Sequence, residues 1–270
     1  MDGAFIVILV SCIYSSGGKV RLNITTGINY LALFLLLNAS VSLAQELPGV
    51  GFDRTRVIYN ASAGERGVAL KYNNNSQTTY LLQSWVSAPD GMMLSPDTLA
   101  QVKDESIPFF VVPPLVRLDA HQSQGLRILR KQGALPDDRE SVFLLVAKAI
   151  PNTPLTDQKG GVLRLAVSTS IKLFYRPASL PAAGIKSVTN QLKFTHRGGS
   201  LVVTNASPFY LTFSALEVGG KAVTGHDRYF MVPPRGETSY ALPAGAGGKV
   251  RWSVLDERGE PTPWAQSPLL

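Results

Sequence analysis

The chain has 270 residues, of which 45% are hydrophobic and 17% charged, so it can bury one large core or two ordinary ones and is not a disordered chain. Its net charge of +7 is spread along the sequence, which argues against a nucleic-acid-binding arm or a polybasic membrane tether. The chain has a single cysteine, Cys12, which excludes a disulfide within the chain. Its three histidines are scattered and do not have the spacing of metal ligands. We therefore expect neither a metal nor a cofactor.

Two apolar stretches come first, at residues 4–14 and 28–37, and neither reaches the length of a bilayer span. The second follows Lys19 and Arg21 and leads to Ser42 and Ala44, small residues at the positions that signal peptidase recognises. The pattern predicts that residues 1–44 are removed, that Gln45 is the mature N-terminus, and that no stable membrane insertion remains.

A signal peptide explains the second stretch but gives no role to residues 1–19. We interpret them as lying upstream of a true translation start near Val20. A genuine N-terminal membrane anchor is the alternative interpretation. Removal of residues 1–44 also removes Cys12, so burial of apolar side chains must stabilise the exported protein without disulfides.

Beyond the signal, short runs of β-branched, aromatic and leucine residues alternate with turn-forming clusters, which is typical of antiparallel β-sheets. The first series of expected strands comprises residues 54–59, 67–72, 80–86, 109–112, 124–129, 141–150 and 162–175. The second series comprises residues 192–195, 200–204, 210–218, 229–232, 238–242 and 249–255.

The segment between the two series, residues 176–184, contains two prolines and several small residues, so it cannot continue a strand. We therefore expect an all-β fold with an N-terminal domain at residues 45–178, a linker at 179–184 and a C-terminal domain at 185–270. Two antiparallel sandwiches in tandem are the simplest architecture for this order of strands.

Five segments of the first series carry a family resemblance. They are Phe52-Asp-Arg-Thr-Arg56, Tyr80-Leu-Leu-Gln-Ser-Trp85, Val112-Pro-Pro-Leu-Val-Arg-Leu118, Leu135-Pro-Asp-Asp-Arg-Glu-Ser141 and Ile171-Lys-Leu-Phe-Tyr-Arg-Pro177. In this order and at these separations they resemble the PapD-like periplasmic chaperones of the chaperone-usher pathway. Looser matches, Asn205-Ala-Ser-Pro-Phe-Tyr210 and Met231-Val-Pro-Pro-Arg235, extend the resemblance to about residues 50–260.

The resemblance implies two immunoglobulin-like β-sandwich domains in an L arrangement. It also implies a periplasmic protein, not an enzyme, that binds pilus (fimbrial) subunits by donor-strand complementation and delivers them to an outer-membrane usher. Self-association of the free protein is compatible with it. Nucleic acid is not an expected partner.

Residues 162–175 are long for one strand, and Leu163, Leu165 and Val167 alternate with more polar neighbours. For an arbitrary strand, such side chains would fill the domain's own core. The resemblance instead makes Leu163, Leu165 and Val167 the donor-strand residues, because this segment matches the strand that the family lends to a subunit. A strand edge of this kind is prone to aggregation when it is unpaired.

Two basic residues, Arg56 and Lys172, match the family's anchor for the C-terminal carboxylate of a subunit. Charge-assisted hydrogen bonds from such a pair can hold a carboxylate. Strict alternation places Lys172 on the opposite face from Leu163, so either a β-bulge intervenes or one strand uses both of its faces. The sequence leaves both possibilities open.

Three charged residues, Arg127, Glu140 and Asp256, match positions that bridge the two domains in the family. We expect their side chains to lie within salt-bridge distance of one another, since one guanidinium can serve two carboxylates.

Two other functional classes remain as alternatives. No nucleophile elbow, phosphate-binding glycine loop or His-x-x-x-His pattern is present, which argues against an enzyme. The second alternative is a secreted immunoglobulin-like structural or adhesin component of a surface appendage. Two full series of strands and a mature chain without cysteine argue against it.

Overall fold

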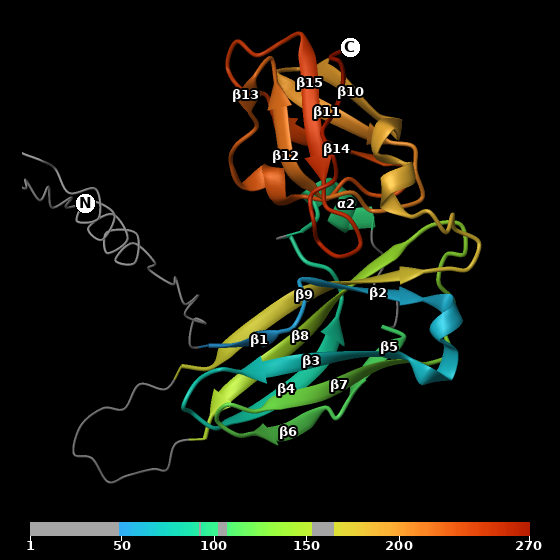
Figure 1. Ribbon diagram of the computed structural model, residues 1–270. Helices are drawn as coiled ribbons and strands as arrows, with labels where there is room; N and C mark the ends of the chain where they lie inside the picture. Colours follow the sequence, from blue (N-terminus) through green and yellow to red (C-terminus); the bar gives the residue numbers. More distant parts are fainter. Residues whose placement is uncertain (1–48, 92, 102–106, 153–164) are drawn as a thin grey trace, which may run out of the picture. The chain divides into compact units, whose positions relative to one another are not determined.

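The computed structural model describes residues 49–91, 93–101, 107–152 and 165–270. They form two β-sandwiches, each with its own apolar core (Figure 1). Predicted donor residue Leu163 and the predicted signal peptide lie outside the described residues. Within the described ranges, no helix has the length and apolar character needed to cross a bilayer.

The first sandwich consists of a four-stranded and a five-stranded sheet. The four-stranded sheet has the order β1 (Val50–Phe52), β3 (Val68–Asn74), β7 (Ser123–Arg130), β5 (Phe109–Val112). The five-stranded sheet has the order β2 (Arg56–Asn60), β9 (Val167–Arg176), β8 (Ser141–Pro151), β4 (Tyr80–Ser87), β6 (Leu115–Leu118). The short elements are η1 (Ala61–Arg66) and α2 (Pro96–Gln101).

Alternation of side chains decides which face of each strand enters the core. In β4, Leu82 and Val86 are buried between the sheets, whereas Leu81 and Trp85 are exposed on the outer face. Strand β8 differs, because six consecutive residues from Val142 to Ala147 are buried. Both faces of β8 are therefore covered, and the outer one is the face that carries the candidate site.

The second sandwich consists of a three-stranded and a four-stranded sheet. The first has the order β10 (Leu192–Arg197), β11 (Ser200–Asn205), β14 (Gly236–Ala241). The second has the order β13 (Lys221–Ala222), β12 (Phe213–Val218), β15 (Lys249–Val254), β16 (Ala265–Pro268). Three short 3-10 segments are η2 (Ile185–Ser187), η3 (Thr189–Gln191) and η4 (His226–Tyr229).

One expected strand is absent. Residues 229–232 form the end of η4 and then a single bridge between Val232 and Leu211. Pro233 and Pro234 follow directly and have no N–H to donate, so a ladder cannot continue there. Strand β12 is likewise shorter than expected, because it begins at Phe213 after the bridge at Leu211.

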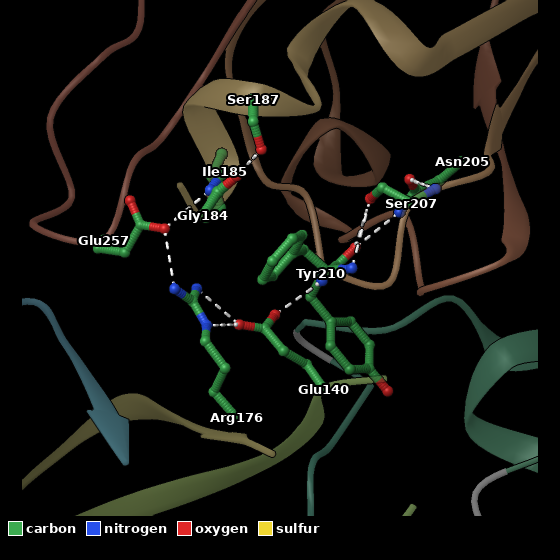
Figure 2. A network of polar contacts seen from close by, with 10 residues as sticks. Glu140, Arg176, Gly184, Ile185, Ser187, Asn205, Ser207, Tyr210 and Glu257 are labelled. Carbon is green, nitrogen blue, oxygen red and sulfur yellow. Dashed lines mark hydrogen bonds and ion pairs between the residues drawn. The ribbon is translucent and has the colours of Figure 1, made fainter. Parts of the chain in front are cut away.

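A buried polar cluster shapes the loop that follows β11. The Asn205 side chain donates to the carbonyl oxygens of Phe209, Val232 and Pro233 at 2.7, 3.3 and 3.0 Å, and accepts from the Ser207 amide at 3.0 Å. These bonds replace the missing strand pairing and fix the loop. The loop ends at Tyr210, whose amide points to the first sandwich (Figure 2).

Candidate functional site

Arg56 and Lys172 lie side by side. Strands β2 and β9 run parallel, and their register pairs Arg56 with Lys172. Arg56 is only 6% exposed, its guanidinium carbon lies 5.8 Å from the centre of the Phe174 ring, and its Nε has no partner among the described residues. The fold thus brings two cations together at a position where one buried donor is unsatisfied.

Desolvation disfavours the charged forms of both Arg56 and Lys172, and the charge of Arg56 further disfavours that of Lys172. Burial and, to a smaller extent, the neighbouring Arg56 lower the pKa of Lys172 to about 8. Among the described residues, the Lys172 Nζ atom donates one long hydrogen bond, of 3.5 Å, to the Thr212 hydroxyl. Burial also lowers the pKa of Arg56, an effect that Asp256, Glu140 and Glu257 partly offset. Two poorly hydrated cations can accept a carboxylate, which would form charge-assisted hydrogen bonds with both.

Strand β9 uses both of its faces. Its pairing with β8 runs without a register shift from Val167 opposite Ala149 to Tyr175 opposite Ser141, so no bulge separates Val167 from Lys172. Val167 shares the inner face with Ile171 and Leu173 of the core, whereas Lys172 points from the outer face. Val167 and Lys172 therefore use different faces of one strand, while Leu163, for which the sequence left the question open, lies outside the described residues.

The apolar line of β9 continues past the end of the core. Ile171 and Leu173 are buried, but Val167 is 44% exposed and Leu165, just before the strand, is 70% exposed. These two residues do not belong to the core of their own domain. The described residues show no position for Leu163.

One edge of β9 is paired over only half of its length. Its ladder with β2 covers Lys172–Arg176, and within the described residues Val167–Ile171 pair on the β8 side alone. An open edge offers backbone N–H and C=O groups to an added strand. The open half of the edge leads directly to the two cations.

A polar network joins the two sandwiches (Figure 2). The Arg176 side chain donates twice to one oxygen of Glu140, at 2.8 and 2.9 Å, and once to Glu257 at 3.1 Å. The other Glu140 oxygen accepts from the Tyr210 amide at 2.9 Å, and Glu257 also accepts from the Ile185 amide at 2.8 Å. Burial raises the pKa of Glu140, and Arg176 and the Tyr210 amide counteract this rise.

The predicted bridging set is only partly correct. Glu140 lies in the network, but Arg127 is an exposed residue of β7, in the other sheet, and donates to the Arg66 carbonyl at 2.6 Å. Asp256 accepts from the amides of Arg258 and Glu260 and lies 3.5 Å from Lys186, all within the second sandwich. No ion pair joins Arg127, Glu140 and Asp256 among the residues described, so that prediction is wrong.

Arg176 and Glu257 take the roles assigned to Arg127 and Asp256. The sequence held a signal for Arg176, because Lys172 and Arg176 are four residues apart on one strand and therefore share a face. Arg176 is also the last residue before Pro177, where the chain leaves the sheet. Glu257 had no comparable signal, since it lies in a turn after β15.

Both sandwiches match families of known proteins. Residues 49–181 match the family model "Pili and flagellar-assembly chaperone, PapD N-terminal domain", and residues 187–265 match "Pili assembly chaperone PapD, C-terminal domain". The probable fimbrial chaperone LpfB of Escherichia coli O157:H7 is 36% identical over 231 residues, which cover 85% of this chain and 90% of LpfB. Chaperone protein FimC of Escherichia coli K12 is 35% identical over 234 residues, which cover 86% and 90%.

Solved structures of chaperones are also similar to this chain. The Escherichia coli chaperone DraB has a TM-score of 0.68 at 33% identity, over 82% of this chain and 97% of DraB. A structure of Salmonella enterica SafA pilin in complex with the SafB chaperone gives 0.69 at 32% identity, over 83% and 98%. The chain therefore belongs to the PapD-like family of pilus-assembly chaperones, which are two-domain immunoglobulin-like proteins and not enzymes.

Proposed function

We propose that this protein is a periplasmic chaperone that binds pilus subunits by donating the open half of β9 and then delivers them to an outer-membrane usher. The observation that carries the proposal is the course of β9, whose open edge, together with the exposed Val167 and the preceding Leu165, leads to the buried Arg56 and the partly buried Lys172. Leu163 is the third proposed donor residue.

Each part of β9 has a separate physical role in this proposal. Main-chain hydrogen bonds along the open edge supply affinity for an extended subunit strand. Leu165 and Val167 enter the subunit's own apolar groove and fix the register, because a slip by one residue would turn them to the other face. Arg56 and Lys172 hold the subunit's terminal carboxylate and so end the added strand at a fixed point.

The same edge accounts for the proposed self-association of the free protein. Without a subunit, two copies can pair their open edges and cover Leu165 and Val167. A bound subunit would compete with this pairing.

Co-expression with the neighbouring fimbrial genes, followed by purification from the periplasm, tests the function. The expected result is a one-to-one complex with a pilus subunit, an intact mass that begins at Gln45, and loss of the subunit in Arg56→Ala and Lys172→Ala. Both variants should be exported and folded. Normal recovery of subunits by both variants would refute the anchor, and a chain that retains residues 1–44 would refute the processing.

A further inference from the structure

A third apolar cluster lies outside the two cores, on the outer face of the five-stranded sheet. Its fully or nearly buried members come from four parts of the chain: Met93 and Leu94 from the segment between β4 and β5, Val142, Leu144 and Val146 from β8, Phe174 from β9, and Met231 from the second sandwich. Ile58 and Tyr210 pack against it. Because one cluster contains residues of both sandwiches, it connects them through apolar contact.

The segment between β4 and β5 is held in a defined local conformation. The amides of Met93 and Leu94 both donate to the Asp90 carbonyl, at 3.2 and 3.3 Å. Ser95 caps α2, since its hydroxyl accepts from the Thr98 amide at 3.3 Å and contacts the Thr98 hydroxyl at 2.8 Å. These bonds present Met93, 3% exposed, and Leu94, 0% exposed, to the sheet.

The second sandwich is tied to this segment by its main chain. The Met231 amide donates to the Met93 carbonyl at 2.9 Å, and the Met231 side chain is fully buried. Apolar burial and a main-chain hydrogen bond thus act at the same place. This contact is separate from the polar network of Glu140, Arg176 and Glu257.

The cluster flanks the carboxylate anchor. Lys172 pairs in register with Leu144, a member of the cluster, and Phe174 of the cluster lies two residues beyond it on the same face. The Lys172 ammonium donates to the hydroxyl of Thr212 at 3.5 Å, and Thr212 belongs to the second sandwich. The position of the second sandwich therefore contributes to the surroundings of Lys172.

We propose that Met93, Leu94 and Met231 form an apolar joint that holds the second sandwich against the Lys172 face, and that this joint stays closed when a subunit binds. The proposal rests on the proposed function, because it concerns how the carboxylate anchor is positioned. Met93, Leu94 and Met231 act as positioning residues and do not contact the carboxylate.

Matched truncations test the positioning role. Leu94→Ala and Met231→Ala should raise the pKa of Lys172 from about 8 toward its ordinary value, as measured by NMR of labelled lysine, because a looser joint admits water. Both should weaken subunit binding by about three- to thirtyfold. Leu82→Ala is the control, because Leu82 is equally buried in the core of the first sandwich alone. Leu82→Ala should lower the melting temperature but change neither the pKa of Lys172 nor subunit binding.

An engineered disulfide tests whether the joint stays closed. Residues joined by a main-chain hydrogen bond such as that between Met231 and Met93 have Cα atoms about 5–6 Å apart, which a disulfide can span. In the chain that begins at Gln45, no other cysteine is present. Oxidised Met93→Cys/Met231→Cys should bind subunits within about twofold of the reduced protein.

Two outcomes would overturn the inference: loss of subunit binding on oxidation, or joint variants that behave like Leu82→Ala. Lys172→Ala distinguishes these from failure of the proposed function. If Lys172→Ala loses subunit binding while the joint variants keep it, only the joint is refuted. If Lys172→Ala binds normally, the anchor itself is refuted.

Discussion

Lys172 is the residue whose charge state is most sensitive to a partner. In the free protein its pKa is about 8, because burial and Arg56 disfavour the charged form. A bound carboxylate favours that form and must raise the pKa, so binding takes up a proton above pH 8. We expect subunit affinity to fall about tenfold between pH 7 and pH 9, with proton uptake measurable by calorimetry in buffers of different ionisation enthalpy.

Lys172→Arg is the control for that titration, since a guanidinium stays charged throughout the range. Its affinity should be nearly independent of pH between 7 and 9. An unchanged pH dependence in Lys172→Arg would show that another group is responsible.

The same residue should limit the stability of the free protein. A lysine with a lowered pKa destabilises the folded state at pH values below that pKa, and the effect disappears as pH rises through 8 toward the ordinary value. Lys172→Met removes the partly buried charge and keeps the approximate length of the side chain. We expect denaturant unfolding at pH 7 to show a gain of about 1–3 kcal/mol, which vanishes near pH 10. A loss of stability at pH 7 would contradict the account of the cation pair.

At the scale of the element, β9 should separate stability from binding. Leu165 is 70% exposed, so Leu165→Glu should change the free energy of unfolding by no more than about 0.5 kcal/mol while abolishing subunit binding. Leu115→Glu is the matched control, because Leu115 is 52% exposed on β6 at the other edge of the same sheet. Thermal unfolding and pull-down of both variants decide the matter. A large loss of stability in Leu165→Glu would show that Leu165 packs in the core of its own domain and is not a donor residue.

The strands themselves were largely predictable from alternation, and the exceptions have physical causes. Strands β1, β6, β13 and β16 were not predicted, because they span only two to four residues and a period of two is hard to recognise at that length. Residues 229–232 have the composition of a strand, but the prolines that follow prevent the single bridge at Val232 from extending into a ladder.

The residues of the candidate site were harder to predict from the sequence than the strands. Arg56 and Lys172 are brought together by the register of two parallel strands far apart in the chain, which no local pattern encodes. They were predicted only through the family resemblance. Arg127 was predicted in place of Arg176 although only Arg176 shares a strand face with Lys172.

At the scale of the whole molecule, the polar network should control how the two sandwiches act together. Arg176 and Glu140 have side chains that are 11% and 1% exposed, so Arg176→Ala leaves a buried carboxylate without its counterion. We expect a loss of about 3–5 kcal/mol in unfolding free energy and a changed interdomain distance in solution scattering. Subunit recovery should fall in parallel.

Arg127→Ala is the control for this prediction. Arg127 is exposed, so its removal should change stability by about 0.5 kcal/mol or less. Equal effects of the two substitutions would show that the network around Glu140 does not hold the sandwiches.

The central claim is that the subunit's terminal carboxylate binds at Lys172 and Arg56, where the open edge of β9 ends. A double-mutant cycle tests it most directly, with wild-type or Lys172→Met chaperone and a peptide of the subunit's C-terminal strand carrying a free carboxylate or an amide. If the two groups interact, the losses are not additive, and the coupling energy should be about 2 kcal/mol or more. A coupling energy near zero, with each change weakening binding independently, would contradict the account.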